Sequence, residues 1–71
     1  MTEDTVYKKV CEHPGMRTYD LSVTTGIALS ELDLHLAYLH DQGRVSMVDG
    51  KWVPAYRKLE FEARLDLRRK G

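Results

Sequence analysis

The feature that most constrains this chain is a series of leucines spaced three or four residues apart, Leu29, Leu32, Leu36 and Leu39. This spacing places them on one side of an α-helix, in a stripe that has to be buried. We expect the helix to begin between Ala28 and Ser30, because Ser30 followed by Asp33 resembles a capping box and would delay the first turn. Gly43, directly after Gln42, is expected to end it. Other elements of the chain must therefore cover the leucine stripe.

Two shorter helical segments are expected before the leucine helix. In residues 2–13, apolar side chains recur at helical spacing, at Val6, Tyr7, Val10 and Cys11. His13-Pro14-Gly15 ends this segment, because proline disfavours helical backbone at the residue before it. Met16 and Arg17 are expected to be extended. Thr18 is expected to cap a short helix over residues 19–25, which ends at Gly26 in a left-handed conformation.

A β-hairpin is expected after the leucine helix. Two β-prone runs, residues 44–48 and 51–53, are separated by Asp49-Gly50. This pair favours a tight turn in which both central residues have positive φ. Pro54 is expected to end the second strand. Helices followed by a hairpin make the expected fold class α+β.

The tail, residues 56–71, combines two conflicting patterns. Its apolar residues alternate strictly with polar ones, as in a β-strand: Leu59, Phe61, Ala63, Leu65 and Leu67. Its residue types, however, are helix formers. A helical tail would carry one apolar stripe and a separate patch of Phe61 and Leu65, the stripe being Tyr56, Leu59, Ala63 and Leu67. We expect a helix or a strand, with the residue types favouring the helix slightly.

The size of the chain limits its function. A single core in 71 residues leaves a net stability of roughly 3–5 kcal/mol. We therefore expect a binding module or an obligate oligomer rather than an enzyme, with no small-molecule substrate. With 42% apolar and 31% charged residues, the composition is typical of a folded domain rather than a disordered one. Apolar runs are short, so no membrane span or signal peptide is expected, and we predict an intracellular, cytoplasmic protein.

The cysteine and histidines do not predict a metal site or a cofactor. Cys11 is the only cysteine, so no internal disulfide can form. It lies near His13, but ligands paired at helical spacing are missing, because His35 and His40 are five residues apart and point away from each other. We expect Cys11 to be a small buried thiol and the two later histidines to be partly packed side chains.

Charge is unevenly spread along a chain whose formal net charge is zero. Residues 1–50 contain four basic and eight acidic residues, a net charge of −4. Residues 51–71 contain seven basic and three acidic residues, a net charge of +4. A partner or a second copy that matches this asymmetry is therefore expected.

The order of the expected elements, and several short motifs, resemble the winged helix-turn-helix family over about residues 3–54. Thr18-Tyr19-Asp20-Leu21 resembles the family's "T-x-x-L" entry to the second helix, and Thr25-Gly26-Ile27 resembles its "T-G-L" turn. Gly43-Arg44-Val45 resembles the "G-x-V" that starts the wing. The resemblance implies a winged-helix domain, which we place at residues 1–55, and it leaves the tail unexplained. We expect residues 56–71 to form an amphipathic, basic C-terminal extension that is used for dimerisation. Winged helices bind DNA but also serve as protein-docking modules.

The outward face of the leucine helix is unusual for a DNA-reading helix. If the leucines face inward, the outward residues are Ser30, Glu31, Leu34, Ala37, Tyr38 and Asp41. Relatives that read DNA typically carry Arg, Lys, Asn, Gln, Ser or Thr there. In this chain only Ser30 and Tyr38 are conventional contacts, and Glu31 and Asp41 would face a polyanion.

The sequence leaves two functional hypotheses. The first is a transcription regulator that binds double-stranded DNA as a dimer and takes much of its affinity from the wing and the tail. Its expected contacts are Arg17, Ser30, Tyr38, Arg44, Lys51, Trp52, Arg57 and Lys58, extended by Arg64, Arg68, Arg69 and Lys70. Trp52 has a second interpretation, since a tryptophan in the wing often covers the core.

The alternative hypothesis is a module for protein interaction or dimerisation. Leu34 and Tyr38, one helical turn apart and outward, form an apolar pair with an acidic rim. Aromatic and apolar anchors of this kind are favoured at interfaces. Phe61 and Leu65 in the tail are expected to belong to the same kind of surface. A folded-back tail of the same chain could also cover Leu34 and Tyr38.

Overall fold

The structure is a computed structural model that describes the backbone of residues 2–70 and the side chains of residues 3–68. In this part the chain forms four α-helices, one 3₁₀ helix and an antiparallel β-hairpin, so the α+β class is confirmed. The elements are α1 (Thr2–Glu12), α2 (Thr18–Thr25), α3 (Leu29–Asp41), β1 (Val45–Val48), β2 (Lys51–Pro54), the 3₁₀ helix η1 (Ala55–Arg57) and α4 (Lys58–Lys70). The side chains of Arg69 and Lys70 lie outside the described residues, and their basic contribution stays a prediction.

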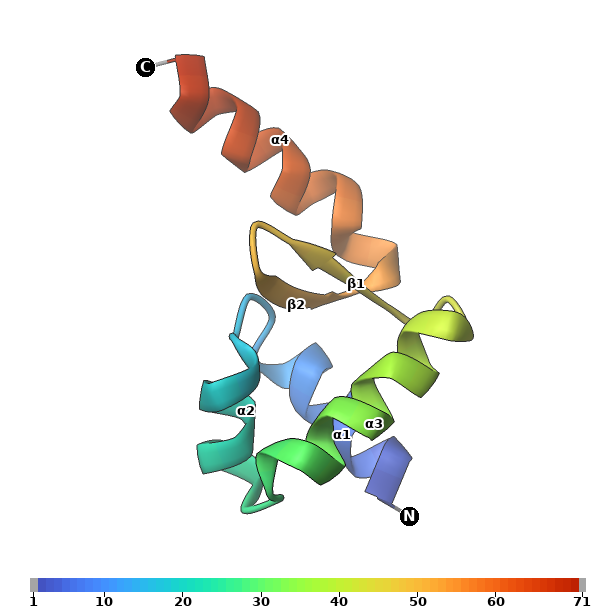
Figure 1. Ribbon diagram of the computed structural model, residues 1–71. Coiled ribbons are helices and arrows are strands. Elements are labelled where there is room, and N and C mark those ends of the chain that lie inside the picture. Colours follow the sequence, from blue (N-terminus) through green and yellow to red (C-terminus); the bar gives the residue numbers. More distant parts are fainter. Residues whose placement is uncertain (1, 71) are drawn as a thin grey trace.

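The core lies where α1, α2 and α3 meet the hairpin (Figure 1). Buried apolar side chains come from every one of these elements: Val6, Val10, Leu21, Leu32, Leu36, Leu39, Val45, Val48 and Val53. The leucine stripe is thus confirmed at three positions, but the prediction is wrong for Leu29, which is 45% exposed. Leu29 is the first residue of α3, so no preceding turn of the helix lies beside its side chain.

The connection between α2 and α3 is held by local hydrogen bonds. Gly26 adopts the expected left-handed conformation, with φ 77°, and its N–H donates to the carbonyl of Ser22. The Ser22 hydroxyl donates to the carbonyl of Ile27 over 2.6 Å, and the Thr25 hydroxyl accepts the N–H of Ile27 over 3.2 Å. α3 starts at Leu29 without a side-chain cap, so a delayed start at Ser30 is excluded.

Thr18 has a different role from the expected one. It is the first residue of α2, and Arg17 occupies the capping position with extended backbone and no side-chain cap. The Thr18 hydroxyl instead accepts a 2.8 Å hydrogen bond from the indole N–H of Trp52. The prediction of Thr18 as a helix cap is therefore wrong, because its hydroxyl accepts a hydrogen bond from Trp52 and Arg17 occupies the capping position.

The hairpin has the expected tight turn. Asp49 and Gly50 have φ values of 54° and 76°. In the antiparallel ladder, Val45 lies opposite Pro54 at one end and Val48 lies opposite Lys51 beside the turn. The segment between α1 and α2 pairs with the edge of β2 that faces away from β1, where Met16 forms an antiparallel bridge with Trp52. The Trp52 N–H donates to the Met16 carbonyl over 2.7 Å, and the Trp52 carbonyl accepts the N–H of Gly15 over 2.8 Å.

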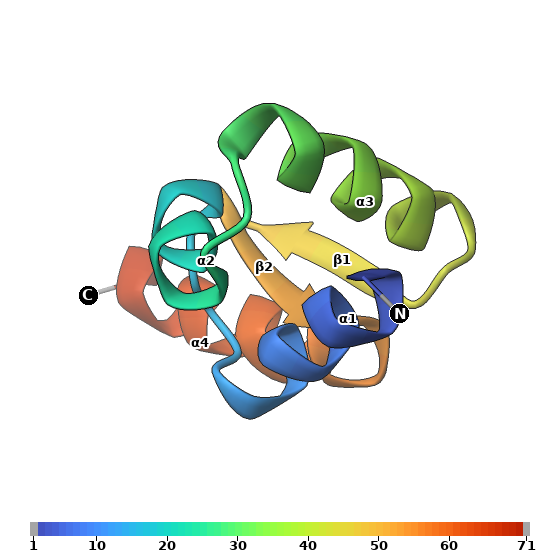
Figure 2. The same cartoon turned by 90° about the horizontal axis from the view of Figure 1, so that it is seen from below.

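The tail forms a helix rather than a strand, and it packs on the hairpin. Figure 1 shows α4 on one side of the hairpin and α1, α2 and α3 on the other. Figure 2, the view from below, shows the three N-terminal helices arranged around the two strands. Among the helices that the structure describes, none has both the length and the apolar character that a membrane crossing requires.

Candidate functional site: a basic groove beside the hairpin tip

Arg17 reaches the tip of the hairpin from the start of α2. A Cβ atom placed on Gly50 would lie 2.8 Å from Nη1 of Arg17, so the guanidinium group lies directly over this glycine. The contact is possible because Gly50 has no side chain and occupies the second turn position with positive φ. It brings a base from the segment before α2 next to Lys51, the first residue of β2.

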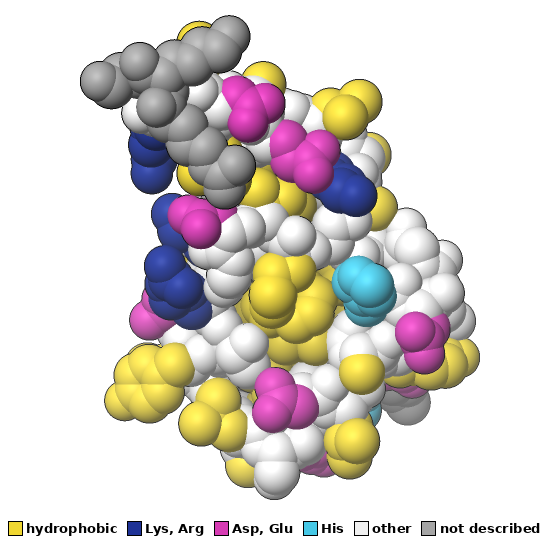
Figure 3. Space-filling view, turned by 45° about the horizontal axis from the view of Figure 1, so that its top comes forward, with side chains coloured by type: hydrophobic (Ala, Val, Ile, Leu, Met, Phe, Trp, Pro, Cys, Tyr) yellow, Lys and Arg dark blue, Asp and Glu magenta, His cyan; other side chains and the backbone are white. Residues whose placement is uncertain are grey.

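A groove lies between the hairpin tip and α4. Its volume is about 190 Å³, and it is lined by Pro14, Gly15, Val48, Asp49, Lys51, Phe61, Arg64, Leu65 and Arg68. Three of these side chains are basic and one is acidic, and four others, Pro14, Val48, Phe61 and Leu65, are apolar. In Figure 3 the dark blue Lys and Arg side chains gather mainly at the left, where α4 passes the hairpin tip. We call this feature the basic groove.

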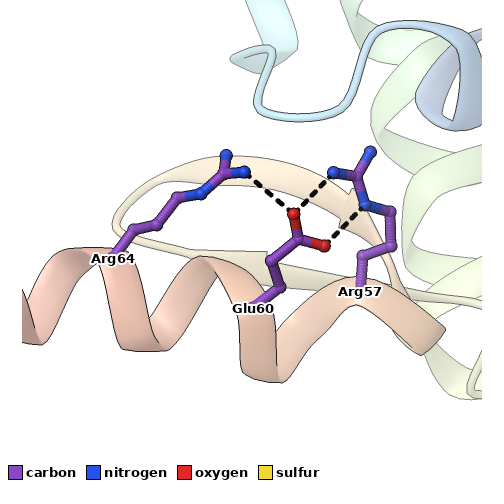
Figure 4. Close-up of polar contacts among 3 residues, drawn as sticks. All are labelled: Arg57, Glu60 and Arg64. Carbon is purple, nitrogen blue, oxygen red and sulfur yellow. Dashed lines mark hydrogen bonds and ion pairs between the residues drawn. The ribbon is translucent and has the colours of Figure 1, made fainter.

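Two arginines and one glutamate of η1 and α4 form a fixed network (Figure 4). Arg57 donates two hydrogen bonds to the Glu60 carboxylate, over 3.0 Å and 2.8 Å, and Arg64 donates one over 2.9 Å. Both guanidinium groups also lie near the ring of Phe61, at 5.3 Å and 5.1 Å from its centroid. Charge-assisted pairs of this kind hold the side chains in one geometry.

The network shifts the pKa values of its members. The hydrogen bonds from Arg57 are the main cause that lowers the pKa of Glu60, and the charges of Arg57 and Arg64 act in the same direction. The same hydrogen bonds raise the pKa of Arg57. Arg57, expected to contact phosphate, is therefore already paired within the chain.

Arg44 is also engaged within the chain. Its guanidinium group lies 4.3 Å from the centroid of the Tyr7 ring, and Nη1 lies 3.7 Å from the Asp4 carboxylate. A hydrogen bond with Cys11, followed by burial, raises the pKa of the Tyr7 hydroxyl. Cys11 does not form a disulfide, and it is half-buried rather than fully buried as expected. Arg44 joins β1 to α1 and is absent from the lining of the basic groove.

Trp52 and Lys58 lie in contrasting environments. Trp52 is half-buried against the core, with its indole N–H bonded to Thr18 and its ring edge-on to His40 at 6.3 Å. The core-covering interpretation of Trp52 is therefore confirmed. Lys58 is exposed at the start of α4, where it is available for a contact.

The outward face of α3 is exposed as expected. Ser30, Glu31, Leu34, Ala37, Tyr38 and Asp41 are all exposed. Leu34 is 73% exposed and Tyr38 is 51% exposed. α4 packs on the hairpin, so the possibility that the folded-back tail covers Leu34 and Tyr38 is excluded. The face contains acids and no base, so it does not add to the basic groove.

The two sides of α4 are both apolar but differ in exposure. Phe61 and Leu65 are half-buried toward the hairpin and line the basic groove. On the other side, Leu59 and Leu67 are 79% and 71% exposed, and Tyr56 of the preceding η1 is 73% exposed. The sequence identified both apolar sides but assigned the interface to Phe61 and Leu65. Periodicity alone did not reveal which side faces the hairpin.

Among the described side chains, no group of three or more His, Cys, Asp or Glu lies close enough together to hold a metal ion. Comparisons with models of protein families, with curated proteins and with solved structures found no match. The geometry of the chain is therefore the basis for assigning its function.

Proposed function

We propose that this chain is a winged-helix protein that binds double-stranded DNA as a transcription regulator. In this proposal the hairpin is the wing, and the basic groove supplies the main contact with phosphates. The element order supports the winged-helix assignment, and so does the isolated Met16–Trp52 bridge, which places the backbone before α2 beside the hairpin. α3 takes part as an atypical acidic helix, through Ser30 and Tyr38.

The observation that carries the proposal is the convergence of cations at the hairpin tip. Lys51, Arg64 and Arg68 line one groove in which Asp49 is the one acidic lining residue, and Arg64 also donates to Glu60 outside the lining. Arg17 adds a fourth cation over Gly50. These residues come from three separate parts of the chain, so the cluster arises only in the folded state. Neutralisation of phosphates by Lys and Arg is the main source of affinity in such complexes.

Several of the basic residues near the hairpin are engaged within the chain. Arg44 is held by Asp4 and Tyr7, and Arg57 and Arg64 are both held by Glu60. A phosphate contact from any of these three arginines would have to break those interactions. Lys51 and Arg68 have no such partner among the contacts seen in the described residues. They are therefore the best positions at which to test the proposal.

A salt-titrated binding measurement tests this function. The anisotropy of a labelled short duplex is measured against protein concentration at several salt concentrations. We expect the logarithm of the binding constant to fall linearly with the logarithm of salt, and each lost phosphate contact to reduce the slope by about 0.9. Lys51→Ala and Arg68→Ala should reduce both affinity and slope.

Lys8→Ala is the matched control, because Lys8 is an exposed base on α1, outside the basic groove. It removes the same charge from the chain and should leave the slope unchanged. The absence of any anisotropy change at micromolar protein in low salt would contradict the proposal. An equal effect of Lys8→Ala and Lys51→Ala would contradict the assignment to the groove.

The exposed pair on α3 favours a second candidate function, a protein-docking module. Leu34 and Tyr38 lie one turn apart, and Glu31 and Asp41 border them. Exposed apolar and aromatic side chains with a polar rim are typical of interfaces. This candidate predicts an assembly that Leu34→Glu or Tyr38→Ala abolishes while the basic groove remains intact.

A further inference from the structure

Apolar side chains form a part of the basic groove that contacts with phosphates do not explain. Pro14, Val48, Phe61 and Leu65 all belong to the lining, and Leu65 is half-buried rather than fully covered by the hairpin. A phosphate oxygen needs cations and hydrogen-bond donors, and it gains nothing from an apolar neighbour. A groove that combines apolar side chains with a few charged groups is typical of a ligand site, where the charged groups orient the ligand.

Two cations of the lining are free to meet a ligand. The side chains of Lys51 and Arg68 form no ion pair or hydrogen bond with another described side chain. Arg64 is different, because its guanidinium group donates a 2.9 Å hydrogen bond within the network of η1 and α4 (Figure 4). Arg17 lies over the hairpin turn and adds positive charge at the same end of the hairpin. The groove therefore offers two unpaired cations beside apolar side chains.

We propose that the basic groove binds a small organic anion. The phosphate or carboxylate group of this ligand contacts Lys51 and Arg68. Its apolar ring lies against Leu65, beside Pro14 and Val48. The groove volume of about 190 Å³ is below the range of roughly 300–1,000 Å³ that is usual for sites of drug-sized ligands. The ligand is therefore a single ring with one anionic group, rather than a nucleotide or a longer chain.

Phe61 forms a fixed wall of this site rather than its main contact. Its ring already lies near the guanidinium groups of Arg57 and Arg64, at 5.3 Å and 5.1 Å from the ring centroid. A Cβ atom placed on Gly15 would lie 3.4 Å from Cε2 of the ring, so the ring also packs closely against this glycine. These contacts leave Leu65 as the apolar side chain of α4 that a ligand in the groove can reach.

Asp49 favours a ligand with an apolar part over a bare ion. It is the one acidic lining residue, so it opposes any anion that enters the groove. Contacts between exposed charges are also screened and contribute little. A tenfold gain in affinity corresponds to about 1.4 kcal/mol, which the burial of roughly 55 Å² of apolar surface supplies. This area is a small part of the roughly 150–250 Å² that an aromatic side chain buries.

Titration of the full chain with phenyl phosphate tests the proposal, and inorganic phosphate and phenol serve as the two halves of the probe. Amide chemical shifts in nuclear magnetic resonance spectra give both the affinity and the place of binding. We expect phenyl phosphate to bind at least about tenfold more tightly than inorganic phosphate or phenol. The shifts should gather at Gly15, Asp49, Lys51 and Leu65. Equal affinities for phenyl phosphate and inorganic phosphate would overturn the proposal, and so would shifts that gather on α3.

Variants separate the charged contact from the apolar one. Lys51→Ala and Arg68→Ala should each weaken phenyl phosphate and inorganic phosphate by a similar factor of about two to five, because both ligands use the anionic group. Leu65→Ala should weaken phenyl phosphate alone and so reduce its advantage over inorganic phosphate. Circular dichroism spectra show whether each variant is folded. Arg68 is exposed, so its truncation tests the site without disturbing the core.

Each class of variant has a matched control outside the groove lining. Leu67→Ala matches Leu65→Ala, because Leu67 is a leucine of α4 that is 71% exposed. Lys8→Ala matches Lys51→Ala, because it removes the same charge from α1. Both controls should leave the two affinities unchanged. Equal losses of phenyl phosphate affinity from Leu65→Ala and Leu67→Ala would contradict the placement of the ring.

A consequence for DNA rests on the proposed function and has its own readout. The duplex and phenyl phosphate would use the same cations, so we expect phenyl phosphate to displace the labelled duplex at concentrations that saturate the groove. Inorganic phosphate at equal ionic strength should displace less. A duplex that stays bound while the groove is full would contradict the DNA assignment and leave the anion site standing. Normal duplex binding beside a failed phenyl phosphate titration would overturn the small-anion site alone.

Discussion

The indole N–H of Trp52 donates a 2.8 Å hydrogen bond to the hydroxyl of Thr18, a residue 34 positions earlier in the chain. The bond joins β2 to the first turn of α2. We expect Thr18→Val to remove the acceptor and to lower the free energy of unfolding by about 1 kcal/mol. For a domain of this size, this corresponds to a melting temperature lower by about 4–8 °C. Thermal unfolding followed by circular dichroism measures it.

Thr18→Ser is the control for this prediction. It keeps a hydroxyl that accepts the bond, so its melting temperature should remain closer to that of the wild type. Equal melting temperatures for the wild type and Thr18→Val would show that the bond contributes no net stability.

The lowered pKa of Glu60 predicts acid sensitivity of the Arg57–Glu60–Arg64 network. A carboxyl with a lowered pKa in the folded state contributes stability that is present above its unfolded pKa and is lost as the pH falls through the folded value. We expect Glu60→Gln to be less stable than the wild type at neutral pH, with the difference vanishing in acid below the ordinary glutamate pKa of about 4.3.

Melting temperatures of both proteins across this pH range measure the effect. The comparison isolates Glu60, because every other carboxylate titrates in both proteins. A difference between the two curves that is independent of pH would refute the ionic origin of the network's stability.

The two sides of α4 should respond differently to truncation. Phe61→Ala removes a half-buried ring that contacts Arg57 and Arg64, and it should lower the free energy of unfolding by about 1–2 kcal/mol. Leu59→Ala removes a side chain that is 79% exposed, and at concentrations where the chain is monomeric it should change stability by less than about 0.5 kcal/mol. Chemical denaturation of dilute protein provides both values. A larger loss for Leu59→Ala would contradict the orientation of α4.

Arg44 should matter for stability and not for DNA affinity. Its guanidinium group covers the Tyr7 ring, and a partly exposed cation–π contact contributes about 0.5–1 kcal/mol. The ion pair with Asp4 is exposed and should add little. Arg44→Ala should therefore lower the melting temperature while the salt slope of duplex binding stays as in the wild type. A reduced slope would place Arg44 among the phosphate contacts.

The local elements could be predicted from the sequence because their signals are local. The tight turn of the hairpin requires positive φ at both central residues, and Asp-Gly is one of the few residue pairs that tolerate this backbone conformation. Gly26 ends α2 for the same kind of reason. The spacing of Leu32, Leu36 and Leu39 determined both the inward and the outward face of α3. Each of these features depends on residues close together in the chain.

The features that were missed depend on contacts between distant residues. Thr18 has the sequence context of a helix cap, and only the position of Trp52 shows that its hydroxyl is used elsewhere. Likewise, α4 has two apolar sides, and the hairpin selects Phe61 rather than Leu59 for contact. The basic groove combines residues from three segments, so charge counts along the sequence located its cations without showing that they converge.

The bonds between the hairpin and the segment before α2 have a consequence for recognition. Gly15 and Met16 bond to both backbone groups of Trp52, and Gly15 and Lys51 lie on the lining of the same groove. The spacing between these parts of the lining is thus set by the backbone of the folded chain. The backbone on this side of the groove is preorganised, so little backbone conformational entropy remains to be lost when an anion binds.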